Sequence, residues 1–420
     1  MQNSKCKIQN AKFKMQNSKC KIQNAKFKIQ NSKLRLGMKV RNVLAVLFSI
    51  FCIAASQAKV ICGAERIDEW KRLLKGQRVA LLANHTATVG DKHLLDKMLE
   101  EKIEVVAVVA PEHGFRGKAD AGEHINSTID QKTGTPIWSL YSAKSRKLTP
   151  EQVAQFDVIV VDMQDVGLRF YTYYISMLSV MNSAAEGGKK VVVFDRPNPN
   201  GMYVDGPILD MKYKSGVGAL PIPIVHGLTM GEIAKMAVGE GWCKACKVEV
   251  VACKNYTHQT RYSLPIAPSP NLRSMQAIYL YPSTCLFEGT VCSLGRGTEH
   301  PFEVYGHPNI KSNFSFTPRS IAGAKYPPLR DKVCYGVDLR TIPHEEIIAN
   351  GFNLEYIIDA YRRVGVGEAF FTSFFEKLVG VDYIRKMIIE GRSANEIRAM
   401  WQSDVEKFKV LRRKYLLYKE

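Results

Sequence analysis

Apolar runs alternate with helix-like segments along the first half of the chain. Runs of small and β-branched residues predict buried strands, at positions 78–84, 105–110, 135–141, 157–161, 190–194, 221–225 and 248–252. Apolar residues at helical spacing predict helices between them, at positions 91–101, 172–186 and 229–238. Strands that alternate with helices are typical of a doubly wound parallel sheet, so we predict a Rossmann-like α/β fold.

The pattern changes after a proline-rich stretch at positions 264–271. Beyond it the sequence predicts a strand at 333–339 and several helices, among them one over 369–379. We therefore expect two domains: a Rossmann-like catalytic domain over residues 59–270, and a smaller α+β domain over 271–420 that closes the cleft.

The first 58 residues differ from the rest of the chain. Positions 2–14 recur almost unchanged at 16–28, and a polar, acid-free repeat of this kind cannot build a core. We expect residues 1–37 to lie outside the mature protein. Residues 38–58 combine a basic start, an apolar stretch and small residues before Lys59, which is typical of a signal peptide. The sequence thus predicts an exported protein, periplasmic or secreted, without a membrane segment after cleavage.

The charge of the chain looks different once this segment is set aside. The whole chain carries a net charge of +19, but residues 1–58 hold 12 basic residues and no acidic one, so the remainder carries only +7. A balance this mild argues against nucleic acid as a partner and suits an anionic polymer such as cell wall. Cys243 and Cys246 lack the second cysteine pair of a zinc site, so we expect buried or paired cysteines instead.

Polar clusters follow five of the predicted strands. The carboxyl ends of parallel strands meet at one edge of a sheet, and ligands bind there. We expect these clusters to form one site, made of Asn84, Glu112, His113, Arg116, Asp162, Gln164, Asp165, Arg169, Tyr171, Tyr173, Asp195, Arg196, Asn198 and His226. The second domain is expected to contribute Asn271, Glu288, Arg296 and Glu299.

Fingerprints of nucleotide-binding proteins and serine hydrolases do not accompany the clusters. The sequence has no GxGxxG after its first strand, no GxxxxGK[ST] loop and no GxSxG elbow. We predict that the protein uses no cofactor and no metal. A metal site built from His113, Asp162 and His226 is a minor alternative, because their spacing specifies no known site.

Six motifs lie in order along the chain: PEHGFRG at 111–117, DMQDVGLRFYTY at 162–173, DRPNPNG at 195–201, VHGLTMGE at 225–232, PSPNLRS at 268–274 and FEGTVCSLGRGTEHPFEVYG at 287–306. Together they resemble the bacterial exo-β-N-acetylmuramidase (NamZ-type) family, formerly described only as a domain of unknown function. The resemblance implies a Rossmann-like domain joined to a smaller C-terminal domain, with the site in the cleft. It also implies an exo-acting glycosidase that removes N-acetylmuramic acid from the non-reducing end of peptidoglycan fragments.

The resemblance makes Glu112, in the PEHG motif, the leading catalytic residue. Glycoside hydrolysis also needs a base or nucleophile at the anomeric carbon. Several candidates remain open for that second role, namely Asp162, Asp165, Asp195, Glu288, Glu299 and the N-acetyl group of the substrate. Inverting and retaining chemistry both stay open.

Substrate contacts can be assigned by chemical type. N-acetylmuramic acid carries a lactyl carboxylate, which arginine binds well, so Arg116, Arg169 and Arg196 are candidates. Tyr171 and Tyr173 are suited to stack on the sugar, or else they form part of the wall. A non-catalytic protein that binds muramyl sugars of the cell wall is the alternative function, and a metal-dependent hydrolase is a third.

Overall fold

The computed structural model describes residues 58–111, 115, 128–140 and 146–420, together with positions 23, 26 and 28. Met1–Lys59 and Val60–Glu420 are separate units, and the elements from η1 (Gly63–Glu65) onward belong to the second. Some predictions lie outside the described residues: residues 38–57 of the predicted signal peptide, most of the repeat before it, and Glu112, His113 and Arg116. Among the helices that are described, none has both the length and the apolar character needed to cross a bilayer.

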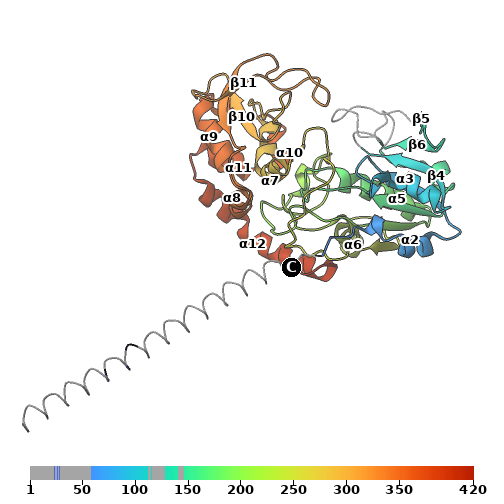
Figure 1. Cartoon of the computed structure of the whole chain (residues 1–420). Helices are drawn as coiled ribbons and strands as arrows, with labels where there is room; N and C mark the ends of the chain where they lie inside the picture. The colour runs from blue at the N-terminus through green and yellow to red at the C-terminus, as the bar shows by residue number, and fades with distance from the viewer. Residues whose placement is uncertain are drawn as a thin grey trace, which may run out of the picture. The chain divides into compact units, whose positions relative to one another are not determined.

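A seven-stranded sheet forms the centre of the first half (Figure 1). Its strands are β1 (Arg78–Ala83), β4 (Glu104–Ala110), β5 (Thr128–Ile129), β6 (Pro136–Ser139), β7 (Val158–Asp162), β8 (Lys190–Phe194) and β9 (Val248–Val251). Their order is β5-β6-β4-β1-β7-β8-β9, and all neighbours are parallel except β5 and β6. The chain runs from β1 out to β6 and then returns to β7 on the other side of β1. This reversal opens a crevice between the carboxyl ends of β1 and β7, which confirms the predicted doubly wound fold.

Helices cover both faces of this sheet (Figure 1). They are α2 (Ile67–Leu74), α3 (Leu94–Glu100), α4 (Pro150–Val153), α5 (Tyr173–Glu186) and α6 (Met230–Gly239). Successive strand residues face opposite sides, as the pleat requires. Leu81 packs in one core with Trp70 of α2 and Met98 of α3, whereas Leu82 packs in the other core, to which α5 and α6 contribute.

The second half is a smaller α+β assembly, as predicted. An antiparallel sheet has the order β10 (Val304–His307), β12 (Cys334–Asp338), β11 (Ser315–Phe316). The helices are α7 (Met275–Thr284), α8 (His344–Asn350), α9 (Glu355–Val364), α10 (Phe375–Val379), α11 (Tyr383–Ile389) and α12 (Ala394–Arg412). The larger core runs on from the sheet to Phe352 and Trp401, so both halves share it. The domain boundary near residue 270 stays a prediction.

Two predicted elements differ in the structure. Residues 221–225 form no strand, and only Val225 makes isolated bridges, because Pro221 and Pro223 lack the N–H groups that a ladder needs. The helix predicted over 369–379 is divided into η4 (Gly367–Phe370) and α10, because the intervening Phe371 pairs with Thr290 as an isolated bridge. The sequence also gave no expectation for the small hairpin of β2 (Thr88–Val89) and β3 (Lys92–His93).

Candidate active site

Hydrogen bonds tie three strand ends together at the crevice. Asn84, just after β1, accepts with Oδ1 from the hydroxyl of Thr86 (2.6 Å), and that hydroxyl accepts from the backbone N–H of Gln164 after β7 (3.0 Å). The Gln164 amide donates to the carbonyl of Pro197 after β8 (2.7 Å). Asn84 and Gln164 are both buried and help to build the edge of the sheet, and their predicted role as substrate contacts stays a prediction.

A buried ion pair closes the same edge. Both carboxylate oxygens of Asp162 accept from the guanidinium of Arg196, whose Nη2 lies 2.8 Å from Oδ2. The side chains are 0% and 6% exposed, respectively, and Arg196 also donates to the carbonyl of Thr88. The negative charge of Asp162 and the positive charge of Arg196 therefore neutralise each other. The catalytic role of Asp162 and the lactyl-binding role of Arg196 stay predictions, and both groups are engaged in this pair.

Asp165 is a carboxyl of a different kind. Its Oδ1 accepts from the backbone N–H of Gly167 (2.7 Å), while its buried Oδ2 has no hydrogen-bond partner among the described residues. Burial raises the pKa of Asp165 to about 7, although backbone N–H groups oppose the shift. A carboxyl in this state can both donate and accept a proton near neutral pH, which suits acid–base catalysis.

A pocket is lined by residues from both halves of the chain, and Asp165 is not among them. We call it the tyrosine pocket, and it is lined by Phe170, Tyr171, Thr172, Tyr173, Val217, Ser269, Asn271, Leu272, Tyr281, Glu288, Arg296 and Phe302. Its volume is about 110 Å³. Five predicted site residues are therefore brought together here: Tyr171, Tyr173, Asn271, Glu288 and Arg296.

The aromatic wall of the pocket is held rigidly. The hydroxyls of Tyr171 and Tyr173 both donate to the carbonyl of Pro268, at 2.8 and 3.2 Å. The two rings meet edge to face with centroids 4.9 Å apart. Tyr281 lies edge-on to Tyr171 and to Phe302, at centroid distances of 6.3 and 4.7 Å. Fixed rings of this kind give a ligand preorganised apolar surfaces.

Charge enters the pocket through one ion pair. The Nε and Nη2 atoms of Arg296 donate to a single oxygen of Glu288, at 3.0 and 2.5 Å. The two side chains are 21% and 24% exposed, and the guanidinium lies over the Phe302 ring at 5.2 Å from its centroid. Asn271 donates to the carbonyl of Gly323 (2.8 Å) and so fixes the loop beside them.

Arg169 is predicted as a site residue, but it does not line the tyrosine pocket. Its fully buried guanidinium donates to four backbone carbonyls, at 2.7–2.9 Å, those of Pro207, Ile222, Leu378 and Val379. Arg169 therefore ties the loop after β7 to the end of α10. No edge of this guanidinium is open to a substrate carboxylate.

Asp195 and His226, two further predicted site residues, are buried and hydrogen-bonded within the protein. Asp195 accepts from the hydroxyls of Thr229 and Tyr418, both at 2.7 Å, and burial raises its pKa to about 6. His226 is fully buried, accepts at Nδ1 from Leu228 N–H, and burial lowers its pKa to about 3. Neither side chain is among the residues that line the tyrosine pocket.

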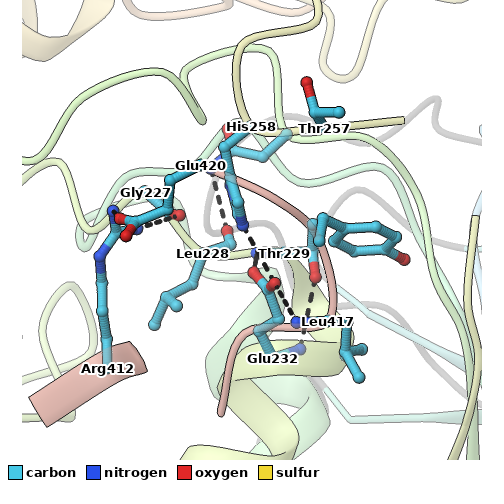
Figure 2. A network of polar contacts seen from close by, with 12 residues as sticks. Gly227, Leu228, Thr229, Glu232, Thr257, His258, Arg412, Leu417 and Glu420 are labelled. Carbon is cyan, nitrogen blue, oxygen red and sulfur yellow. Dashed lines mark hydrogen bonds and ion pairs between the residues drawn. The ribbon is translucent and has the colours of Figure 1, made fainter. Parts of the chain in front are cut away.

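The C-terminal residues complete this structural region, as Figure 2 shows. Glu232 accepts from Thr229 N–H, from the His258 ring and from Leu417 N–H, at 2.8–3.0 Å. Arg412 donates to the Gly227 carbonyl and to Glu420. The end of the chain is thereby clamped to the start of α6.

Asn198 and Glu299 are two further residues of the predicted site. Asn198 is buried and its amide donates to the Leu228 carbonyl, so it braces the loop after β8 rather than contacting a ligand. Glu299 is exposed and does not line the tyrosine pocket. In the part of the chain that the structure describes, no three His, Cys, Asp or Glu side chains are close enough to hold a metal ion.

Tyr281 and Phe302 are pocket residues that the sequence reasoning missed. Phe302 lies inside the motif at 287–306, from which only the charged residues Glu288, Arg296 and Glu299 are predicted to join the site. Tyr281 precedes that motif by six positions, in an apolar segment that reads as core. Its wall position depends on the packing of α7 against the first half.

Comparisons with known proteins agree over nearly the whole described unit. Family models described as exo-β-N-acetylmuramidase NamZ match residues 79–276 (N-terminal) and 279–418 (C-terminal). The peptidoglycan β-N-acetylmuramidase NamZ of Bacillus subtilis (strain 168) is 37% identical over 387 residues, which cover 87% of this chain and 92% of the relative.

Solved structures agree as well. Two crystal structures of DUF1343 family proteins from Bacteroides fragilis NCTC 9343 are similar to this chain. One has a TM-score of 0.82 at 57% identity and covers 86% of this chain and 100% of its own. The other has a TM-score of 0.75 at 27% identity, with 86% and 99% coverage.

The doubly wound fold, the crevice with its aromatic pocket and these matches define the protein as a glycosidase of the α/β class. The chain belongs to the exo-β-N-acetylmuramidase NamZ family.

The raised pKa of Asp165 predicts how the stability of the fold changes with pH. The folded state holds the proton of this carboxyl up to a pKa of about 7, whereas the ordinary value is 3.8. The stability that the proton confers is complete below the ordinary value and is lost as pH rises through the folded value. Wild-type protein should therefore lose melting temperature between about pH 5 and about pH 8, and Asp165→Asn should lose less.

The control for this test is Asp157→Asn. The half-buried Asp157 is hydrogen-bonded to Arg78, which lowers its pKa to about 2, so it does not titrate in the same interval. This variant should follow the wild-type profile between the two pH values. Calorimetric melting temperatures that fall equally in Asp165→Asn and wild type contradict the assignment.

Proposed function

We propose that the protein is an exported exo-β-N-acetylmuramidase that releases N-acetylmuramic acid from the non-reducing ends of peptidoglycan fragments. The observation that carries the proposal is the match of both halves to the NamZ family, with an aromatic pocket lined by residues of both halves. Export is supported by the signal-peptide pattern at residues 38–58, and it fits a cell-wall substrate.

The tyrosine pocket is assigned to the terminal sugar. A volume of about 110 Å³ is smaller than the pockets that enclose whole drug-sized ligands, so it suits one substituted face of a sugar rather than a disaccharide. Tyr171, Tyr173 and Phe302 offer ring faces and edges for the apolar side of the sugar.

Arg296 is assigned to the lactyl carboxylate that distinguishes N-acetylmuramic acid from N-acetylglucosamine. The sequence suggests three other arginines as ligands of this carboxylate. Arg169 and Arg196 are buried and bonded to other groups, and Arg116 lies outside the described residues. Arg296 lines the pocket and bonds Glu288 through Nε and Nη2, so we assign its Nη1 edge to the substrate.

Glu112 is assigned as the proton donor to the leaving oxygen. It directly follows Pro111 at the carboxyl end of β4, which neighbours β1 at the crevice edge, and it matches the glutamate of the family's PEHG motif. Glycoside hydrolysis needs a second group at the anomeric centre. Asp165 fits best, because Asp162 is paired with Arg196, Glu288 is paired with Arg296 and Glu299 is exposed.

Replacing Glu112 by Gln tests the acid role through the leaving group. We expect kcat on a muramyl disaccharide to fall by roughly 10²–10⁴-fold, because its sugar alkoxide needs a proton. An aryl β-N-acetylmuraminide with an acidic phenol should be affected far less, since that phenolate leaves without protonation. Asp165→Asn should impair both substrates alike.

Glu104→Gln is the matched control, because Glu104 is exposed at the opposite end of the same strand. It should behave as wild type. Full turnover of both substrates by Glu112→Gln removes Glu112 from the mechanism. Wild-type protein that binds both ligands saturably but hydrolyses neither is instead a sugar-binding protein.

Replacing Arg296 by Gln tests recognition of the lactyl group. Loss of one charged hydrogen bond should raise KM for the aryl muraminide by roughly 10- to 100-fold, and should leave KM for any turnover of the N-acetylglucosaminide analogue nearly unchanged. Arg385→Gln is the control, because Arg385 also pairs with a glutamate, Glu376, and lies over a phenylalanine ring at 5.3 Å, but it does not line the pocket. An equal effect of Arg296→Gln on both substrates refutes the assignment.

A further inference from the structure

The N-terminal segment of the described unit pairs with the residues that follow β9. Ile61 and Lys254 exchange both backbone hydrogen bonds, at 3.1 and 2.8 Å, in an isolated antiparallel bridge. In an antiparallel ladder, the residues next to such a pair face each other as a non-hydrogen-bonded pair, with their side chains on one side and close together. Those two residues are Cys62 and Cys253, which are 191 positions apart in the sequence.

The two thiols lie in contact inside the protein. Cys62 and Cys253 are 3% and 8% exposed, and the bridge between Ile61 and Lys254 sets the two residues opposite each other. The backbone N–H of Cys253 points away from Cys62 and donates to the hydroxyl of Tyr418 (2.8 Å), as expected for a non-hydrogen-bonded pair. The Cys253 thiol also approaches the carbonyl of Asp195 (3.2 Å), so the pair abuts the turn that carries Arg196.

The environment makes the two sulfurs unequal. The hydrogen bond from Cys253 lowers the pKa of Cys62, and the positive charge of Arg196 acts in the same direction. The same hydrogen bond and burial raise the pKa of Cys253. Cys62 is therefore the sulfur better able to react as a thiolate, with Cys253 beside it as the resolving thiol.

We propose that Cys62 and Cys253 form a disulfide bond, which fastens the N-terminal segment to the carboxyl end of β9. With a small disulfide such as oxidised glutathione as the oxidant, the Cys62 thiolate attacks one sulfur and releases a first glutathione thiol. The Cys253 thiolate then attacks the mixed disulfide at Cys62 and releases the second. The protein loses two protons and two electrons, and one glutathione disulfide is reduced to two thiols.

The bond goes beyond the glycosidase reaction and concerns no residue assigned to it. Oxidising compartments outside the cytoplasm let such bonds persist, so the pairing fits the proposed export of the protein. It closes a loop of nearly two hundred residues, and long loops gain most from a cross-link in the chain-entropy account.

Peptide mapping tests the pairing directly. The full-length chain is incubated with oxidised glutathione, denatured with an alkylating agent in the absence of reductant, and digested with trypsin. We expect tryptic peptides 60–66 and 248–254 to appear joined, and to separate when a reductant is added before alkylation. Finding Cys62 and Cys253 alkylated, or either joined to Cys243, Cys246 or another cysteine, overturns the proposal.

A stability comparison gives a second measurement. Reduction of the oxidised wild type should lower the melting temperature by about 4–6 °C, and should leave Cys62→Ser unchanged, because that variant has no bond to lose. Cys243→Ser is the control, since Cys243 is half-buried and lies outside the pair, and it should keep the wild-type response. A reductant effect of the same size in Cys62→Ser contradicts the proposal.

Hydrolysis of the aryl muraminide is measured on the same oxidised samples. Joined peptides in a protein without turnover support this inference and refute the proposed function. Separate peptides in an active enzyme refute this inference and support the proposed function.

Discussion

The buried ion pair between Asp162 and Arg196 is the interaction on which the crevice depends. It joins the ends of β7 and β8 and reaches the β2 hairpin through Thr88, in surroundings that exclude water. Removing either partner leaves the other charge buried without compensation, which costs about 3–5 kcal/mol. Three residues further along the same loop, Asp165 has no cationic partner among the described residues, and its proton is retained instead. The two nearby carboxyls thus differ in state: Asp162 is ionised and stabilises the fold, whereas Asp165 retains a proton and suits acid–base chemistry.

The site also depends on a rigid joint between the two halves. Arg169 links the loop after β7 to the end of α10 through four carbonyls, and the tyrosine pocket takes its walls from both sides of this joint. The shared apolar core and the clamped C-terminal residues restrict movement further. Tyr171 and Arg296 come from segments far apart in the chain, yet they line one cavity because these contacts fix the halves against each other.

The sequence predicted the architecture well because strand and helix periods are local signals. Runs such as the one at 105–110 mark buried parallel strands. Local patterns could not say which polar side chains turn inward. Arg169 and Asp195 resemble ligand-binding residues in sequence but satisfy buried backbone groups and helix starts. Tyr281 reads as core until the packing of α7 makes it a pocket wall.

We propose that the tyrosine pocket holds the terminal N-acetylmuramic acid of the substrate. A crystal structure of Glu112→Gln with a muramyl disaccharide bound tests this claim most directly. We expect the terminal sugar to lie against Tyr171 and Tyr173, with its lactyl carboxylate on Arg296 and its anomeric carbon facing Asp165. A sugar bound away from this pocket, or one whose lactyl group points to solvent, contradicts the account.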